Sequence, residues 1–420
     1  MVQLVIKDAT AVDGRRISVV CDSGIISEVV GEGEPVPEGD RIIDGKERLI
    51  MPGMCNTHTH ASMALLRGIG EDRDLQSWLK EEIWPREAKM KEHHFEAGMA
   101  LACLEMIKTG TTLFNDMYFM EGDLARVVDD MGLRAVLGEG FLDLHSEEKR
   151  EENIRMTERA IRGIQELDSG RITHSIAPHS IYTVSREGLE WCRDRAAEDE
   201  VPLHLHLSET EHEVRESREK TGKDPAEYLD ELGMLGPGTL LAHCVHLKSV
   251  EIDLISRRGC SVSHNPVSNM KLSSGGPMPL AEMIGNDLRI SIGTDGAASN
   301  NTLDMFISTR IAALMSKHAW GADSVGSAEF YDMSTINGYR SLGLDGGSIR
   351  EGRLADLILV DLRHHSMNPM NDHISNLVYS TTGEAVTHTI VDGEVLMDEG
   401  RVEGEKDIIQ KAREAAEELR

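Results

Sequence analysis

The stretch Met51-Pro-Gly-Met-Cys-Asn-Thr-His58-Thr-His60 decides how the rest of the chain is interpreted. The apolar residues Leu49 and Ile50 lead into it, so the sequence predicts a strand that ends in a turn. Histidines at positions i and i+2 of a strand point to the same face, with Cα atoms roughly 7 Å apart. Both imidazoles can then reach one metal ion at about 2 Å. A His-x-His pair alone is more often a chance pair, so the interpretation depends on elements further along the chain.

Strand-like and helix-like segments alternate after this stretch. Amphipathic helices are predicted at 151–167, 187–198 and 225–232, the last with Asp224 as N-cap and Pro225 in the first turn. Eight parallel strands with helical crossovers predict an α/β fold, a (β/α)8 TIM barrel whose active site lies at the C-terminal strand ends. The eight predicted strands end near His58, Asn115, Asp143, His179, His206, His243, His264 and Asp295.

Both ends of the chain carry short strand-like runs separated by turn signals. We therefore predict a small β-sandwich domain built from residues 1–50 and 345–405, around a catalytic barrel domain at 51–344. Residues 406–420, rich in Glu, Lys and Ala, predict a C-terminal surface helix.

The composition narrows the class of function. With 44 basic and 73 acidic residues, the formal charge of −29 argues against a nucleic-acid partner. The sequence has no apolar run of the ~18–20 residues that span a membrane, and no signal-peptide pattern. Six scattered cysteines without a Cys-x-x-Cys pair suit a reduced compartment. We expect a cytoplasmic protein that acts on a small molecule.

The fifth strand, Val201-Pro-Leu-His-Leu-His206-Leu-Ser-Glu209, adds a second pair of histidines. His204 and His206 share a face, so spacing alone does not say which one binds metal. His206 is nearer the C-terminal end of the strand and has Glu209 three residues on. We therefore expect His206 to be the ligand and His204 to be an interior barrel residue.

The sixth and eighth strands supply further polar groups. His243 closes the apolar run of the sixth strand, whereas His246 is expected to open the following loop. Asp295, in Gly-Thr-Asp-Gly, ends the eighth strand, although such a motif alone is usually a turn. Three neutral imidazoles and a carboxylate suit Zn²⁺, with Fe²⁺ as an alternative. A catalytic ion lowers the pKa of a water ligand toward ~7, and Glu209 is the expected general acid/base; a structural metal site, or no metal, is the alternative.

A second metal ion is not expected. A two-metal barrel of this kind commonly bridges its ions with a carboxylated lysine on the fourth strand. Lys149 is the only lysine between Asp116 and His206, and it lies in a charged segment that predicts a helix start. One divalent ion is therefore predicted.

These segments resemble the amidohydrolase superfamily, and within it the methylthioadenosine/S-adenosylhomocysteine deaminase branch, which includes 5'-deoxyadenosine deaminases. The resemblance runs through nearly the whole chain. It is carried by His58-Thr-His60, His206-Leu-Ser-Glu209, His243-Cys-Val-His246, Ser263-His-Asn-Pro-Val-Ser-Asn269 and Gly293-Thr-Asp295-Gly-Ala-Ala-Ser-Asn300.

The resemblance implies hydrolytic deamination at C6 of an adenosine derivative, which gives the inosine derivative and ammonia. Glu209 would protonate N1 of the adenine and then the departing amino group. Asp295 would accept the proton of the attacking water, and His243 would hold that water. The implied metal ligands are His58, His60, His206 and Asp295.

The resemblance also implies residues that bind the nucleoside. Trp78 would line the sugar or thioether side, Glu87 would accept hydrogen bonds from the ribose hydroxyls, and His179 would contact the nucleoside. Without the resemblance, Trp78 reads as a buried helix residue and Glu87 as a solvated one.

One segment departs from relatives that accept S-adenosylhomocysteine, where an arginine after the third strand is implied to pair with the amino-acid carboxylate. Glu139 occupies that place here, and a second arginine is matched by Arg150 or, with a one-residue gap, by Lys149. Because two carboxylates repel each other, we expect 5'-deoxyadenosine, methylthioadenosine or adenosine to be preferred.

Other functions stay open at this stage. The same metal set suits a guanine or cytosine deaminase or a chlorotriazine-type hydrolase, for which Glu87 would have no ribose to hold. A non-catalytic binding or scaffold protein is a further alternative, although such chains usually lose a ligand or acid/base residue. The resemblance implies a homo-oligomer such as a tetramer. Recycling of S-adenosylmethionine products or general purine salvage would be the biological purpose.

Overall fold

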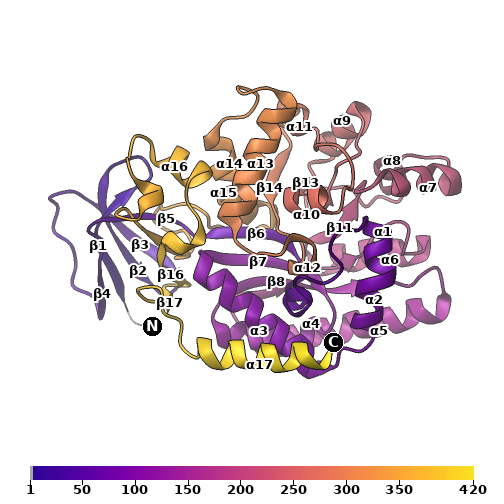
Figure 1. Cartoon of the computed structure of the whole chain (residues 1–420), viewed down its shortest axis with the longest axis horizontal. Helices are drawn as coiled ribbons and strands as arrows, with labels where there is room; N and C mark the ends of the chain where they lie inside the picture. The colour runs from indigo at the N-terminus through magenta and orange to yellow at the C-terminus, as the bar shows by residue number, and fades with distance from the viewer. Residues whose placement is uncertain (1–2) are drawn as a thin grey trace.

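A computed structural model describes residues 3–420. Its centre is a curled parallel sheet of short buried strands with helices around it (Figure 1). The strands are β6 (Met54–Thr59), β7 (Thr111–Tyr118), β8 (Arg134–Phe141), β9 (Ile172–His174), β10 (Ala177–Pro178), β11 (Leu203–Leu207), β12 (Thr239–His243), β13 (Ser261–His264) and β14 (Arg289–Ile292). This arrangement is TIM-barrel-like and confirms the α/β class.

Hydrogen bonds join the two halves of this sheet. The order β6-β7-β8-β10 meets the order β11-β12-β13-β14 where Ile176 pairs with Leu203. At the other seam the Asp295 amide donates to the His58 carbonyl oxygen at 2.9 Å. A Cβ at Gly293 would lie 2.8 Å from that oxygen, so the seam needs a glycine there. The curled sheet thereby closes at the level of the predicted site.

The predicted strand ends lie within three residues of the observed ends, and the largest differences are in the second strand, which ends at Tyr118, and the eighth, which ends at Ile292. The fourth strand is split in two. That strand is interrupted after His174, so β9 and β10 together occupy its position beside β8. The predicted helices at 151–167, 187–198 and 225–232 correspond to α5 (Glu147–Leu167), α6 (Arg186–Asp199) and α8 (Pro225–Glu231). Asp224 caps α8 in a capping box with Glu227.

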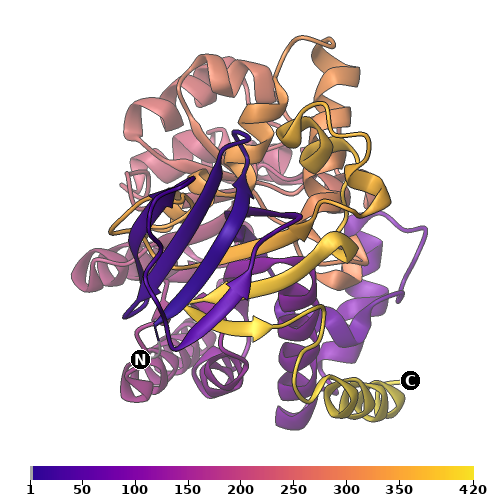
Figure 2. The same ribbon diagram turned by 90° about the vertical axis from the view of Figure 1, so that its left-hand side faces the viewer.

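Strands from both ends of the chain form one further sheet, which faces the viewer in Figure 2. Its eight strands are β1 (Leu4–Ala11), β2 (Arg16–Asp22), β3 (Ile25–Gly31), β4 (Arg41–Asp44), β5 (Arg48–Pro52), β15 (Leu357–Asp361), β16 (Val386–Val391) and β17 (Glu394–Met397). The hydrogen bonding gives one sheet and does not divide it into two, so the predicted sandwich is not confirmed. The predicted domain boundaries stay a prediction.

The two sheets are tied together at two points. Gly53 links β5 directly to β6, and a Cβ there would collide with the Thr112 side chain. Arg134, at the start of β8, forms a buried ion pair with Asp356 at 2.7 Å, just before β15. Breaking one partner of such a pair leaves an uncompensated buried charge, which typically costs about 3–5 kcal/mol.

Helices cover the outside of the curled sheet. They are α1 (Leu75–Trp78), α2 (Trp84–Glu87), α3 (Glu92–Thr109), α4 (Glu121–Met131), α5 (Glu147–Leu167), α6 (Arg186–Asp199), α7 (Glu211–Thr221), α8 (Pro225–Glu231), α9 (Ser249–Arg258), α10 (Pro266–Lys271), α11 (Leu280–Gly285), α12 (Ala297–Asn300), α13 (Met305–Trp320), α14 (Ser327–Ser334), α15 (Ile336–Ser341), α16 (His373–Tyr379) and α17 (Glu405–Glu418). The C-terminal helix α17 packs against α3 (Figure 1). No helix within residues 3–420 is long and apolar enough to cross a membrane.

Candidate active site

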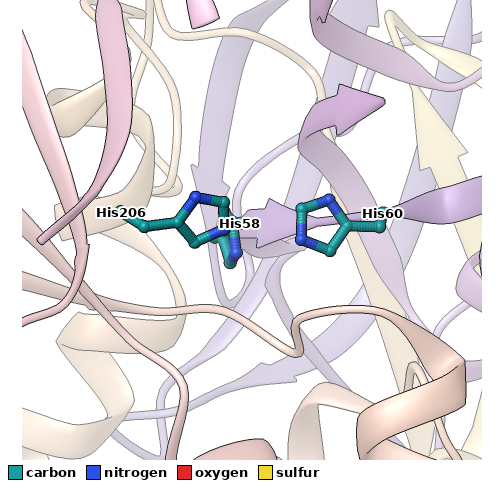
Figure 3. A group of neighbouring side chains, drawn as sticks. All are labelled: His58, His60 and His206. Carbon is teal, nitrogen blue, oxygen red and sulfur yellow. The ribbon is translucent and has the colours of Figure 1, made fainter. Parts of the chain in front are cut away.

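The four predicted metal ligands lie together at the carboxyl ends of the strands. His58 lies on β6 and His60 directly follows it, His206 lies on β11, and Asp295 follows β14. The potential ligand atoms of His58, His60 and His206 lie within 4.8 Å of one another, as do those of His58, His243 and Asp295. Figure 3 shows the three imidazoles of the first group converging, with His58 between the other two in this view.

The distances between these atoms suit one small divalent cation. Nε2 of His60 lies 3.2 Å from Oδ1 of Asp295, and Nε2 of His58 lies 3.5 Å from the same oxygen. Ligand atoms about 2.0–2.1 Å from a tetrahedral ion are roughly 3.3 Å from one another. Nε2 of His58 is buried and makes no hydrogen bond to any residue in the described part of the chain.

The opposite ring nitrogens hold two of these histidines in the tautomer that binds metal. Nδ1 of His60 donates to the Met117 carbonyl oxygen at 2.6 Å, and Nδ1 of His206 donates to the His179 carbonyl oxygen at 2.6 Å. Because a carbonyl only accepts, each Nδ1 carries a proton, and in the neutral ring Nε2 is the nitrogen that presents a lone pair. The donor set fits Zn²⁺, with Fe²⁺ as an alternative.

Burial sets the charges of this group. It lowers the pKa of His58 to about 3 and that of His206 well below its usual value, so both rings are neutral. Burial also opposes charge on His60, but the hydrogen bond to Asp295 and its negative charge outweigh this and raise the pKa of His60 to about 9. Despite its burial, the neighbouring imidazoles of His58 and His60 hold the pKa of Asp295 well below its usual range. Asp295 is therefore the anion at the centre of the group.

His243 differs from the predicted ligands in its hydrogen bonding. The side-chain nitrogen of Asn269 lies 2.8 Å from Nδ1 of His243, so Nδ1 accepts and the proton of the neutral ring lies on Nε2. Burial lowers the pKa of His243 to about 4, which keeps the ring neutral. His243 therefore offers an N–H donor, which suits the expected role of holding a water molecule.

Glu209 lies two residues beyond β11, beside the same group. Its carboxylate is buried, accepts a hydrogen bond from Ser274 Oγ at 3.3 Å, and lies 3.7 Å from Nδ1 of His243. Burial, together with the charge of Asp295, raises the pKa of Glu209 to about 8. The carboxyl group therefore carries a proton at pH 7, which a general acid requires. The Glu209 backbone is fixed because its N–H donates to Glu213 at 2.9 Å.

The group borders a cavity lined by residues from the strand ends and from the α1–α2 segment. Three predicted nucleoside-binding residues, Trp78, Glu87 and His179, line the same cavity. Burial raises the pKa of Glu87, and its carboxylate accepts a hydrogen bond from the Tyr118 hydroxyl. The complete lining is His60, Met63, Leu75, Trp78, Leu79, Trp84, Glu87, Met117, Tyr118, Phe119, Gly140, Leu142, His179, Tyr182, His206, Glu209, His243 and Asp295.

The structure does not bring Glu139 and Arg150 to this cavity. The Glu139 carboxylate accepts the backbone N–H groups of Met120 and Glu121 at the start of α4, at 3.1 and 2.9 Å. The guanidinium of Arg150, on α5, lies 3.9 Å from the carboxylate of Glu187. The prediction that Glu139 faces the substrate carboxylate is therefore not supported by the geometry.

Some residues of the site were not predicted from the sequence. Tyr118 holds Glu87, and Asn269 sets the tautomer of His243. Asn269 is the last residue of the Ser263–Asn269 motif, so the sequence motif already included it. Tyr118 carried no such signal, because it depends on how β7 and the α1–α2 segment meet.

A second cluster, His93, His94 and Glu418, is less suited to metal. Nε2 of His93 and of His94 lie 3.0 and 3.3 Å from the Glu418 carboxylate. However, Nδ1 of His94 accepts the Lys91 backbone N–H at 3.0 Å, so the proton of neutral His94 lies on Nε2. The cluster is a hydrogen-bonded contact between α3 and α17.

A third cluster consists of His388, Asp398 and Glu399. Its carboxylates already pair with arginines: Asp398 with Arg41 at 2.8 Å, and Glu399 with Arg48. Both carboxylates of this cluster therefore already have a cationic partner.

Comparison with known proteins agrees with this geometry. The model of the amidohydrolase family matches residues 49–396. This chain belongs to the amidohydrolase family. Its amidohydrolase relatives match it over almost the whole sequence, which explains why the family motifs follow one another in the expected order along the chain.

Two relatives of this amidohydrolase are named 5'-deoxyadenosine deaminase. The one from Methanoregula boonei is 46% identical over 383 residues, which cover 91% of this chain and 87% of the relative. The one from Methanosphaera stadtmanae is 40% identical over 421 residues, covering 99% of both chains. A crystal structure of an adenosine deaminase from Xanthomonas campestris with bound zinc is 32% identical, with a TM-score of 0.93 over 99% of this chain and 98% of that one.

Proposed function

We propose that this amidohydrolase hydrolytically deaminates the adenine C6 amino group of 5'-modified adenosines, with 5'-deoxyadenosine, methylthioadenosine and adenosine preferred over S-adenosylhomocysteine. The observation that carries the proposal is one cavity lined by two sets of residues. The first set is a metal-type donor set with the protonated Glu209, and the second is Glu87 with Trp78. Relatives named 5'-deoxyadenosine deaminase support the same substrate class.

His58, His60, His206 and Asp295 would hold one divalent ion, most simply Zn²⁺. Such an ion lowers the pKa of a bound water and makes it a nucleophile at neutral pH. Asp295 accepts the proton of the attacking water, and the Nε2–H of His243 holds the water oxygen in position. These two residues suit their roles because one is an anion and the other a neutral donor.

Glu209 donates and accepts protons at the purine ring. Protonated at pH 7, it donates to N1 of the adenine as water adds to C6. The carboxylate then takes up the water proton that Asp295 accepted and transfers it to the departing amino group, so that ammonia is formed. The hydroxyl proton that is lost as the C6 carbonyl of the inosine derivative forms returns to Glu209. Glu209 thus acts as acid and base in one turnover.

The rest of the cavity explains the proposed preference at the 5' position. Glu87 accepts hydrogen bonds from the ribose hydroxyls, and His179 contacts the nucleoside. Among the described residues that line the cavity, none is Lys or Arg, whereas Leu75, Trp84, Phe119 and Leu142 are apolar. An apolar 5' group suits this wall. The carboxylate of S-adenosylhomocysteine would meet no cation there, and burying an unpaired charge is costly.

The test compares kcat/KM for 5'-deoxyadenosine, methylthioadenosine, adenosine and S-adenosylhomocysteine on one zinc-loaded preparation, from the change in adenine absorbance. We expect the first three to exceed the last by tenfold or more, about 1.4 kcal/mol of discrimination. If S-adenosylhomocysteine is the best substrate, the preference is wrong. If no nucleoside reacts and guanine, cytosine or a chlorotriazine does, the free-base or triazine alternative replaces the proposal of nucleoside deamination.

The homo-oligomer, the cytoplasmic location and the role in recycling S-adenosylmethionine products stay predictions. Size-exclusion chromatography with light scattering measures the first directly.

A further inference from the structure

The segment 269–275, which covers the end of α10 and the turn after it, touches two residues of the proposed catalytic machinery. The side-chain nitrogen of Asn269 lies 2.8 Å from Nδ1 of His243, and the Ser274 hydroxyl donates to the Glu209 carboxylate at 3.3 Å. The Ser274 N–H donates to the Asn269 carbonyl oxygen at 3.0 Å, so both contacts belong to one compact turn. The placement of this segment therefore affects how Glu209 is held.

His246 holds the 269–275 segment through its side chain. It is half-buried and lies three residues after β12, in the loop before α9. Its Nε2 lies 2.7 Å from the Ser274 carbonyl oxygen, and Nε2 donates because a carbonyl only accepts. A Cβ at Gly275 would collide with the same nitrogen, so the ring packs directly against the backbone. The imidazole of His246 therefore fixes the peptide between Ser274 and Gly275.

The backbone of His246 is joined to the segment that carries Glu209. Its N–H donates to the Ser208 carbonyl oxygen at 2.9 Å, and Ser208 directly precedes Glu209. The Glu213 carboxylate accepts the backbone N–H groups of Ser208 and Glu209, at 2.8 and 2.9 Å. His246 thus connects two segments that meet at Glu209. Its backbone holds the chain before the acid, and its side chain holds Ser274.

The side chain of Glu209 depends on Ser274. In the part of the chain that the structure describes, the Ser274 hydroxyl is the hydrogen-bond donor to this carboxylate. A hydroxyl both donates and accepts, so the same contact serves the acid and the carboxylate form. An acid must lie within hydrogen-bond reach of the atom it protonates, and a displacement of about 1 Å can lower a rate up to about 100-fold.

We propose that His246 is a positioning residue that acts through Ser274 to hold the Glu209 carboxyl group against the purine. The inference rests on the proposed function, because it assumes that Glu209 is the acid and base of the deamination. Neither His246 nor Ser274 lines the cavity, so His246 acts on the acid and not on the substrate.

A double-mutant cycle tests this path. Values of kcat and KM for 5'-deoxyadenosine are measured for His246→Leu, Ser274→Ala and the double variant. We expect each single variant to lower kcat about tenfold and to change KM less than about twofold, because the nucleoside-binding residues are unaltered. The double variant should lose no more than Ser274→Ala alone. Independent effects would multiply to about 100-fold, and that result would overturn the proposal.

Two further variants separate the hydrogen bond from a general structural role. In His246→Gln, a side-chain N–H can donate to the same carbonyl, so kcat should stay within about threefold of the unmodified chain. The matched control is His373→Leu, at a half-buried histidine at the start of α16 that does not line the cavity; it should change kcat less than about twofold. Equal losses in His246→Gln and His246→Leu would refute the role of the hydrogen bond.

Hydrogen–deuterium exchange gives a measurement that does not depend on the substrate. Backbone amides in peptides that span 269–278 should exchange at least about threefold faster in His246→Leu than in the unmodified chain or in His373→Leu. Unchanged exchange would show that His246 does not hold the segment, whatever the reaction. If exchange increases as expected but the unmodified chain deaminates no nucleoside, the proposed function is wrong and the catalytic role of His246 falls with it.

Discussion

The metal-type residues and the proposed nucleoside-binding residues are built on different parts of the fold. The metal-type residues lie at strand ends, with His58 0%, His206 5% and Asp295 6% exposed. The nucleoside-binding residues depend on the α1–α2 segment, where Trp84 is 41% exposed and Glu87 is half-buried. The difference teaches that the sheet fixes the groups that act on water, whereas a surface segment completes the binding site. Changes to the metal-type residues are therefore expected to affect all substrates, and changes to the nucleoside-binding residues to depend on the substrate.

The largest effect is expected from Glu209→Gln. The amide cannot donate and recover a proton as the acid does, so kcat/KM is expected to fall on the order of 10²- to 10⁴-fold for every nucleoside. Zinc content, measured by atomic emission, is expected to stay unchanged. Glu211→Gln, an exposed neighbour in the first turn of α7, is the control and should retain activity within about twofold. Similar losses in both variants would contradict the role of Glu209.

Glu87→Gln tests the proposed nucleoside-binding residues. Losing hydrogen bonds to a carboxylate costs about 1.5–3 kcal/mol, or roughly 10- to 100-fold in kcat/KM for 5'-deoxyadenosine. A 2',3'-dideoxy analogue lacks the hydroxyls, so the variant should process it about as well as the unmodified enzyme does. Glu81→Gln, an exposed position between α1 and α2, serves as the control. Equal losses on both substrates would mean that Glu87 does not bind the ribose.

The next largest effect is expected in the pH dependence of kcat/KM. Burial raises the pKa of Glu209 to about 8, and the protonated form is the acid. Protonation is lost as pH rises through that value, so kcat/KM should decline above pH 8 by about tenfold at pH 9. Because burial is the larger cause, the decline should be present with every substrate. A rate that increases between pH 8 and 9 would contradict this assignment.

The smallest effect is expected from Arg150→Ala. Since Arg150 lies outside the cavity lining, the ratio of kcat/KM for S-adenosylhomocysteine to that for 5'-deoxyadenosine should change less than about twofold. A selective loss of S-adenosylhomocysteine turnover would show instead that this residue reaches the substrate.

The same contrast explains what could be predicted from the sequence. His58, His206, His243 and Asp295 were identifiable because each ends or follows a short apolar run, and the ends of parallel strands meet at one face. Glu139 was misplaced because neighbouring strand residues point to opposite faces. Gly140 and Leu142 line the cavity, so Glu139 faces the other way and caps α4.

Other features depend on contacts between distant segments. The bond from Tyr118 to Glu87 and the hydrogen bonds that link His58, His204 and Asn115 join different strands or a strand and a surface segment. The break between β9 and β10 likewise has no sequence signal, because His174-Ser-Ile-Ala177 contains no turn residue such as Gly or Pro. These required the three-dimensional structure.

The sheet formed from both chain ends also constrains synthesis on the ribosome. β5 pairs with β1 on one edge and with β15 on the other, and β15 follows the entire barrel in the sequence. At roughly 5–20 residues per second, β5 waits on the order of tens of seconds for its partner. An unpaired strand edge can pair with other chains during that interval. The nascent protein therefore exposes this strand edge until about the last sixth of the chain is made, when the barrel can already be folding.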